Sequence, residues 1–222
     1  MYSIAIHGPA GAGKSTIAKT VAKNLGFIYV DTGAMYRAMA LYFLRNGIDG
    51  KDSEAISKSC KDIKVSLSYK DGEQQVILND ECVNAFIRTE EVGNMASLTS
   101  PNPDVRAALL DLQRDMARTQ DIIMDGRDIG TNILPDATVK IYLTASSCVR
   151  AKRRYDELVA KGVECSLDEI EKDIIDRDYQ DMHREIAPLR QAEDAVYLDS
   201  SYMTIEEVVA AIEKIFSEKL DK

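Results

Sequence analysis

Basic residues are the minority among the charges of this 222-residue chain, which has 28 lysines and arginines against 37 acidic residues and a net charge of −9. General binding to nucleic acid needs an excess of basic surface, so this class of function is not expected. No apolar run approaches the length of a membrane span. The N-terminus lacks the basic region, the long apolar region and the cleavage site of a signal peptide. We therefore expect a cytoplasmic protein that binds neither nucleic acid nor a membrane.

Cysteine and histidine are too few and too scattered for a metal framework. The four cysteines form no C-x-x-C pair, and only His7 and His183 could join them as ligands. A zinc site or a set of disulfides is therefore not expected, and the cysteines are interpreted as reduced thiols packed like small apolar residues. We assign His183 a structural role as well.

The composition is that of one compact α/β domain, because 45% of the residues are hydrophobic and the length suits a single core. Several arginines stand beside glycines and acidic residues. In an acidic protein this pattern is compatible with a cationic pocket for a small polyanion. These arginines are Arg37, Arg106, Arg127, Arg153, Arg177 and Arg184.

The first 45 residues alternate between apolar strands and a helical period. Residues 3–6 and 27–30 read as buried strands, and residues 15–25 and 33–45 have apolar side chains at helical spacing. Gly26 supplies a stop for the first helix. A strand, a glycine turn, a helix and a second strand form a βαβ unit, so we predict a parallel sheet covered by helices.

The rest of the chain adds strands to this sheet and two insertions. Residues 65–69 and 75–78 alternate in polarity around a turn at 70–72, which predicts an antiparallel hairpin. The stretch from 148 to 184 is charged, helical in period and broken at Gly162. The remaining predicted elements are a helix after Pro103, strands at 122–124, 139–143 and 196–198, and a C-terminal helix. This makes five core strands.

Residues 8–15 read GPAGAGKS and satisfy the pattern G-x-x-x-x-G-K-[ST] at every fixed position. In such a loop the backbone N–H groups and the following helix N-terminus bind phosphate oxygens. Lys14 would bridge the β- and γ-phosphates, and the Ser15 hydroxyl would ligate Mg²⁺. The alternative is a glycine-rich turn with an incidental lysine. It is disfavoured because the motif follows an apolar strand and opens a helix.

Asp125 follows the predicted strand at 122–124, which is the position of the acidic residue that helps to hold Mg²⁺ in phosphate-loop proteins. We expect it to hold the metal through water, near Ser15. Taken alone, Asp125 would be interpreted as a solvated acid that begins a turn. The complete phosphate loop upstream favours the metal role.

A phosphate loop alone fits a kinase, a GTPase, a helicase motor or a transporter ATPase. The chain has no N-K-x-D tetrapeptide, which GTPases use to read guanine. Helicase and transporter motors are usually larger. The small size and the charged segment before the last strand favour a kinase for a nucleotide or a small metabolite.

Three further segments have distinctive motifs. They are residues 31–37 (DTGAMYR), residues 125–131 (DGRDIGT), and residues 177–184 (RDYQDMHR) followed by Ala-Pro-Leu at 187–189. These segments resemble the patterns D-[ST]-G-A-x-Y-R, D-G-R-D-x-G-T, R-D-x-x-D-x-x-R and A-P-L of the bacterial cytidylate kinases. The stretch at 87–89 also falls in the family's order, so the resemblance covers nearly the whole chain.

The resemblance implies a fold and a division of the chain. The fold is an α/β, three-layer P-loop fold with a five-stranded parallel core sheet flanked by helices, a small antiparallel insertion that binds the nucleoside monophosphate (NMP), and a helical lid. The whole chain, 1–222, would form one kinase domain, and we expect a monomer. Its parts would be a core at about 1–60, 102–148 and 190–222, the NMP-binding insertion at about 61–101, and the lid at about 149–189.

The resemblance also implies a reaction, in which ATP with Mg²⁺ phosphorylates CMP or dCMP to give ADP and CDP or dCDP. The expected ATP-binding residues are Gly8, Pro9, Ala10, Gly11, Ala12, Gly13, Lys14, Ser15 and Thr16. The expected catalytic residues are Lys14, Arg37, Arg127 and Arg153. The expected CMP-binding residues are Thr32, Arg37, Arg106, Arg127, Asp128, Arg177, Asp181 and Arg184. Ser15 and Asp125 are the expected metal residues.

Within the acceptor site, the resemblance directs Asp128 and the Thr32 hydroxyl to the amino group of cytosine, and Arg106 and Arg184 to its O2 and N3 atoms. It directs Arg177 and Asp181 to the ribose. The hairpin at about 65–83 is expected to fold back over this site.

Each motif has a simpler interpretation. Residues 31–33 could be a plain helix N-cap, residues 125–131 an ordinary glycine loop, and the stretch near Arg177 a solvated helix face. Met35 and Tyr36 are interpreted as core residues. The rival functions are a kinase for UMP, AMP, dTMP or shikimate, and a phosphate-loop NTPase that acts as a switch or binding module.

Overall fold

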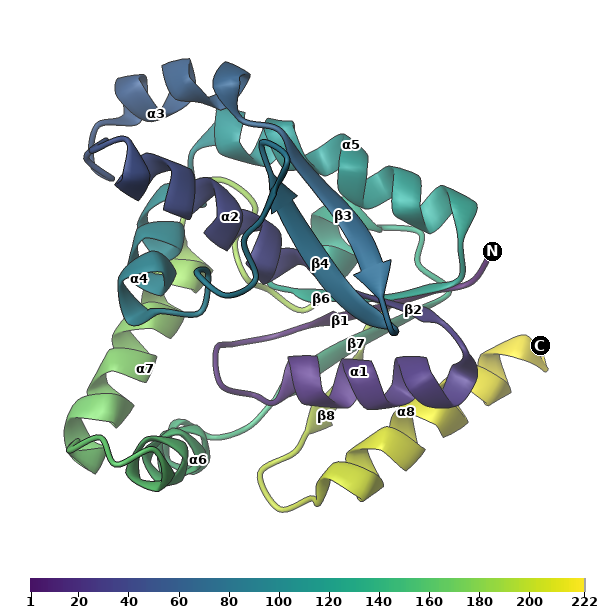
Figure 1. The fold of residues 1–222 in the computed structure, drawn as a ribbon. Helices are drawn as coiled ribbons and strands as arrows, with labels where there is room; N and C mark the ends of the chain where they lie inside the picture. The colour runs from purple at the N-terminus through teal and green to yellow at the C-terminus, as the bar shows by residue number, and fades with distance from the viewer. Residues whose placement is uncertain (222) are drawn as a thin grey trace.

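The computed structural model describes residues 1–221, and its centre is a five-stranded sheet with the strand order β2-β6-β1-β7-β8 (Figure 1). Every neighbouring pair in this sheet is parallel. The predicted five-stranded parallel sheet is therefore confirmed. Its strands are β1 (Ser3–His7), β2 (Ile28–Asp31), β6 (Ile122–Gly126), β7 (Val139–Thr144) and β8 (Val196–Asp199).

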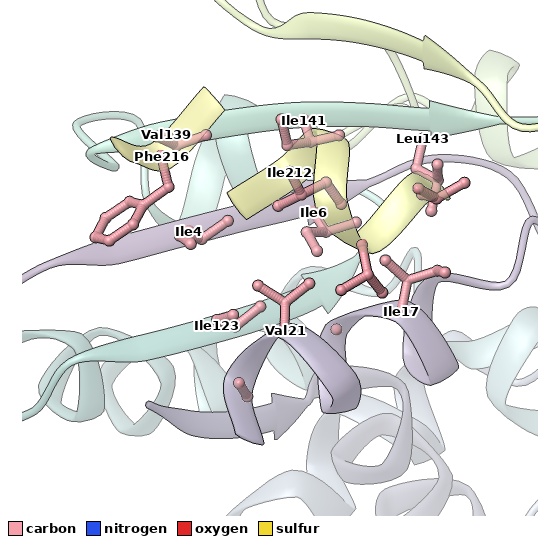
Figure 2. Close-up of a cluster of buried hydrophobic side chains, with 14 of the residues drawn as sticks. Ile4, Ile6, Ile17, Val21, Ile123, Val139, Ile141, Leu143, Ile212 and Phe216 are labelled. Carbon is pink, nitrogen blue, oxygen red and sulfur yellow. The ribbon is translucent and has the colours of Figure 1, made fainter. Parts of the chain in front are cut away.

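Helices cover both faces of this sheet. Successive side chains of a strand point to opposite faces, so each strand can supply apolar side chains to both. Ile4 and Ile6 of β1 lie with α1 (Lys14–Leu25) and α8 (Ile205–Leu220) in one buried cluster, which Figure 2 shows. Ala5 points to the opposite face and packs in a second cluster. That cluster is formed with α2 (Thr32–Arg45) and α5 (Pro103–Thr119). Both faces are thus apolar, which produces the three layers visible in Figure 1.

A second, antiparallel sheet has the order β3-β4-β5 and follows α3 (Ser53–Ser59) and a 3₁₀ turn at Cys60–Asp62. Its strands are β3 (Val65–Lys70), β4 (Glu73–Leu78) and β5 (Glu81–Cys82). Asp71 and Gly72 have φ angles of 54° and 77°, as a tight two-residue hairpin turn requires. The predicted hairpin is confirmed, and β5 is an addition that the sequence pattern did not predict. The sheet shares a buried cluster with α2 and α4 (Glu90–Thr99).

The charged segment before the last core strand forms two helices, α6 (Ser147–Ala160) and α7 (Leu167–His183). The break lies at Gly162, whose φ of 73° is left-handed, as predicted. Figure 1 shows this pair of helices at the edge of the molecule, beyond the carboxyl ends of the core strands. None of the helices in the described part of the chain has both the length and the apolar character to cross a membrane.

The interpretation of the cysteines was only partly right. All four are free thiols, but Cys60 alone is buried, while Cys82 and Cys148 are exposed and Cys165 is half-buried. The residue type alone therefore does not predict which of the cysteines are buried.

Candidate active site

The phosphate loop joins β1 to α1, and its glycines allow a close approach to the neighbouring strand. A Cβ atom on Gly8 would lie 2.0 Å from the carbonyl oxygen of Leu143 in β7. Gly11 and Gly13 have φ angles of 74° and 82°, in the left-handed region that favours glycine. The loop therefore curves tightly above β7 and opens at the N-terminus of α1, where the helix dipole favours an anion.

Lys14 is buried at the start of α1, with 6% of its surface exposed. Its Nζ atom donates to the carbonyl of Pro9 at 2.7 Å, so the ammonium lies across the loop. Burial and, next, the positive charge of Arg127 lower the pKa of Lys14 to about 7, against the opposing effects of Asp125 and Asp181. A buried ammonium that is disfavoured in this way would gain free energy from a polyanion in the loop.

Ser15 and Asp125 meet at the carboxyl ends of the strands. Ser15 Oγ donates to Asp125 Oδ2 at 2.9 Å, and the Tyr29 hydroxyl donates to Asp125 Oδ1 at 2.9 Å. Burial and the negative charge of Asp31 raise the pKa of Asp125 to about 6, although Lys14 and the two hydrogen bonds oppose this shift. A hydroxyl and a carboxylate side by side are hard oxygen ligands of the kind that Mg²⁺ prefers.

Residues 1–221 contain no cluster of three or more histidine, cysteine or acidic side chains that could hold a metal. A cation at Ser15 and Asp125 would therefore need further ligands from water and from phosphate oxygens. Mg²⁺ binds in this manner, because it keeps several waters and takes only one or two protein carboxylates. The residues present thus fit a Mg²⁺ ion that arrives with a nucleotide.

Two cavities meet at this end of the sheet. The larger, about 770 Å³, is lined by the phosphate loop, the start of α1, and residues of α6 and α8. The smaller, about 100 Å³, is lined mainly by α2, α4, α7 and the segment after β6. The residues that line both cavities are Gly33, Arg37, Gly126, Arg127 and Arg177. Three guanidinium groups therefore stand where the two cavities join.

The smaller cavity contains a network of buried ion pairs. Asp128, with 3% of its surface exposed, pairs with Arg106 and, at 3.4 Å, with Arg184. Asp181 accepts from Arg127 Nε at 2.7 Å. The guanidinium groups hold the pKa of Asp181 below its usual range, although burial alone would raise it. The cavity thus offers both donors and carboxylate acceptors to a polar ligand.

Asp31 connects the N-terminus of α2 to two arginines. Its Oδ1 accepts from the backbone N–H of Ala34 at 2.9 Å, so the N-cap interpretation of this motif is correct. Its Oδ2 also accepts from Arg37 at 3.2 Å and from Arg88 at 2.7 Å. Burial would raise the pKa of Asp31, but the two guanidinium groups hold it below its usual value. The motif therefore caps a helix and orients cavity arginines at the same time.

The structure brings most of the predicted residues together. Ala10 to Thr16 line the larger cavity, while Gly8 packs against β7 beneath it. Arg153 also lines this cavity and donates to the carbonyl of Ser200 at 2.8 Å. The smaller cavity is lined by the predicted residues Thr32, Arg37, Arg106, Arg127, Asp128, Arg177, Asp181 and Arg184. The Thr32 hydroxyl donates to the Asp125 carbonyl at 2.8 Å, so its lone pairs remain available to accept.

The hairpin at 65–83 lines neither cavity, and α4 supplies that wall through residues such as Ser97. The hairpin packs on α2, with which its apolar side chains share a core. Its placement over a bound acceptor stays a prediction. Met35 is core, as predicted, but Tyr36 lines the smaller cavity with the Arg106 guanidinium 5.6 Å from its ring centre.

Sequence reasoning missed Arg88, Arg150 and Asp178. The Arg150 guanidinium donates to the carbonyl oxygens of Ala10 and Ala145 and to Asp178 Oδ2, at 2.9, 2.8 and 2.6 Å. It therefore joins the phosphate loop to both helices of the charged segment. Arg150 precedes Arg153 by one helical turn, and that spacing was the available signal for a second arginine on the cavity side.

The sheet order, the phosphate loop and the paired cavities define a phosphate-loop protein of the nucleoside monophosphate kinase class. The family model described as Cytidylate kinase matches residues 4–218. The chain belongs to the cytidylate kinase family.

Individual comparisons agree with this assignment. The chain is 49% identical to the cytidylate kinase of Lactobacillus johnsonii over 219 residues, which cover 99% of this chain and 95% of the relative. It is 50% identical to the cytidylate kinase of Ligilactobacillus salivarius over 216 residues, with 97% and 96% covered. A solved structure of an uncharacterized protein from Eubacterium ventriosum aligns with a TM-score of 0.55 at 12% identity, covering 98% of this chain and 99% of that one. This last likeness shows the fold alone.

Proposed function

We propose that this chain transfers the γ-phosphoryl group of ATP to CMP or dCMP and releases ADP and CDP or dCDP. One observation carries the proposal most directly. A cavity that contains the phosphate loop joins a smaller polar cavity at Arg37, Arg127 and Arg177. Donor and acceptor phosphates would meet at this junction, and the family membership agrees with that arrangement.

The larger cavity is the proposed ATP site. Its loop would surround the β- and γ-phosphates, and Lys14 would leave the Pro9 carbonyl to pair with them. Ser15 would hold Mg²⁺ directly and Asp125 through water. When bound, Mg²⁺ neutralises charge on the phosphate oxygens. Arg153, which lines the same cavity, is proposed to contact the ATP phosphates.

The acceptor needs no general base. The attacking oxygen belongs to a phosphate whose second pKa is about 6, so it is already ionised near neutral pH. The protein then has to align two polyanions and offset their repulsion. Arg37 and Arg127 are the groups proposed to grip the CMP phosphate, since both line the junction of the cavities.

The smaller cavity is the proposed nucleoside site. Arg177 and Asp181 are assigned to the ribose, and Arg106 and Arg184 to O2 and N3 of the base. Asp128 and the Thr32 hydroxyl would accept from the N4 amino group. Uracil has a carbonyl oxygen at that position, so Asp128 would face another acceptor. An unpaired buried acceptor costs about 1–3 kcal/mol, which is roughly a tenfold to hundredfold preference for cytosine.

We also propose a working division of the chain. The segments at about 1–60, 102–148 and 190–222 would form the core, 61–101 the NMP-binding insertion and 149–189 a lid. Closure of α6 and α7 over ATP would exclude water, which would otherwise accept the phosphoryl group. The protein is proposed to act as a cytoplasmic monomer without nucleic acid, in keeping with its net charge of −9.

A panel of acceptors tests this function. ADP formation from ATP is measured with CMP, dCMP, UMP, AMP, dTMP or shikimate, with no acceptor, and with EDTA in place of Mg²⁺. Fast ADP formation with CMP and dCMP that depends on Mg²⁺ is the expected result. A preference for another acceptor would support a rival kinase, and equal hydrolysis with and without acceptor would support an NTPase switch.

A further inference from the structure

A single π-helical turn, Ile129–Ile133, follows Asp128 after β6. The N–H of Asn132 donates to the Asp128 carbonyl at 2.9 Å, and the N–H of Leu134 reaches the Ile129 carbonyl at 2.7 Å. The second bond joins residues five positions apart, which is the hydrogen-bond pattern of a π-helix. Single π-helical turns are rare and often occur at functional sites. Here the turn returns the side chain of Asn132 to the carboxylate of Asp128.

The Asn132 amide and a guanidinium share one oxygen of that carboxylate. Asn132 Nδ2 donates to Asp128 Oδ2 at 3.0 Å, and Arg106 donates to the same oxygen. A carboxylate can only accept here, so the amide nitrogen of Asn132 must face it. Arg184 approaches the other oxygen, Oδ1, at 3.4 Å. Two donors thus occupy Oδ2, and Oδ1 keeps the greater free capacity to accept.

Helix α5 fixes this turn at both ends. Arg106 binds the Asp128 carboxylate at the start. Arg114, two helical turns further along α5, donates through Nη2 to the Asn132 carbonyl at 2.9 Å and through Nε to the Ile133 carbonyl at 3.2 Å. The backbone of Asn132 is therefore held from outside the cavity, which fixes the origin of its side chain.

We propose that Asn132 is a positioning residue for base recognition, and this inference rests on the proposed function. By occupying Oδ2 beside Arg106, the Asn132 amide turns Oδ1 of Asp128 toward the exocyclic amino group of the acceptor base. Asn132 itself does not line the nucleoside cavity. It acts through the orientation of Asp128 and so sets the preference for an amino group over a carbonyl at that position of the base.

Steady-state kinetics with CMP and UMP test this role. Asn132→Leu keeps a similar side-chain volume and removes the donor. We expect it to lower the CMP/UMP ratio of kcat/KM about threefold to tenfold, the range for loss of one hydrogen bond. The loss should appear in the KM for CMP, with kcat and the KM for ATP little changed. Asn132→Asp places a second carboxylate beside Asp128 and should lower the ratio further.

Asn24→Leu is the matched control. The amide nitrogen of Asn24, on α1, also donates to a carboxylate oxygen, Glu213 Oε1 at 2.7 Å, and Asn24 lines neither cavity. We expect this variant to leave the CMP/UMP ratio unchanged. Thermal unfolding of all three variants shows whether a loss of activity comes from unfolding.

The outcomes separate this inference from the function on which it rests. A wild-type enzyme that does not prefer CMP over UMP would contradict the proposed function. A wild-type enzyme that prefers CMP, together with folded Asn132 variants that keep the wild-type ratio, would overturn the positioning role alone. An equal fall of kcat/KM for CMP and UMP would also overturn the positioning role, because loss of a residue with only a structural role would affect both acceptors equally.

Discussion

The Ser15 hydroxyl donates to the Asp125 carboxylate at 2.9 Å, and this bond joins the phosphate loop to the end of a strand 110 residues away in the sequence. Asp125 lies on β6, which pairs with β1 in the centre of the sheet, and the phosphate loop leads from the end of β1 to Ser15 at the start of α1. The pair therefore depends on the sheet order, and its charge state should depend on pH.

The protonation of Asp125 should affect the stability of the ligand-free protein. Burial above all raises the pKa of this carboxyl from its ordinary value of 3.8 to about 6 in the folded protein. The protonated carboxyl of Asp125 therefore makes its full contribution to the free energy of unfolding below pH 3.8. This contribution is lost as the pH rises through about 6. The free energy of unfolding of wild type relative to Asp125→Asn should fall between about pH 4 and about pH 7. Urea unfolding without nucleotide at several pH values measures it, and a difference that rises with pH would contradict the assignment.

Lys14→Ala should abolish phosphoryl transfer and leave the fold intact. The lysine serves the phosphate charge, so we expect kcat to fall at least about a hundredfold. In the ligand-free protein its ammonium is disfavoured, because burial lowers its pKa to about 7. The thermal midpoint without nucleotide should therefore not fall by more than a few degrees. CDP formation and thermal unfolding are measured on the same sample, and an active variant would refute the role.

Gly8 and Gly13 should respond differently to alanine. In Gly8→Ala the new Cβ would meet the Leu143 carbonyl at 2.0 Å, so β1 and β7 must separate. We expect a loss of about 3 kcal/mol or more in the free energy of unfolding. At Gly13 no heavy atom lies within 4 Å of an added Cβ, so the only cost is the strain of an alanine at a φ of 82°. Gly13→Ala should cost about 1–2 kcal/mol. Equal losses in urea unfolding would show that the contact with β7 is unimportant.

Asp128→Asn tests the recognition of the base. The amide keeps the shape of the side chain but can turn its NH₂ group toward the ligand, so the preference for an amino donor on the base should weaken. We expect the CMP/UMP ratio of kcat/KM to fall about tenfold or more. Arg106 and Arg184 also lose their buried carboxylate, so stability should fall as well. An unchanged ratio in a folded variant would remove Asp128 from base recognition.

Local patterns predicted the core of the fold well. The phosphate loop follows a pattern that spans eight consecutive positions, and β1 and β6 are continuous apolar runs because both of their faces are buried. Each of these elements can be recognised from its own residues alone. The two-residue strand β5 depends on its pairing with β4, and the π-helical turn at 129–133 is held by Arg114 of α5 as well as by its own backbone bonds. Neither element has a pattern of this kind in the sequence. Burial of the cysteines depends on the same long-range packing.

The site residues that were missed are those whose roles depend on distant partners. Arg150 contacts Ala10, 140 residues earlier, and Arg88 contacts Asp31, 57 residues earlier. An arginine on a charged helix face looks the same in the sequence whether it faces solvent or a phosphate loop. The sequence pattern predicts the hairpin but not the helix on which its apolar face packs, which is α2. Only the tertiary structure separates these cases.

Transfer of labelled phosphate distinguishes phosphorylation of CMP from hydrolysis of ATP. ATP carrying a γ-³²P label is mixed with CMP, Mg²⁺ and the purified protein, and the products are separated. We expect the label to appear in CDP in an amount equal to the ADP formed, and we expect no labelled CDP from Lys14→Ala. Label found in inorganic phosphate instead of CDP would contradict the proposed transfer to CMP.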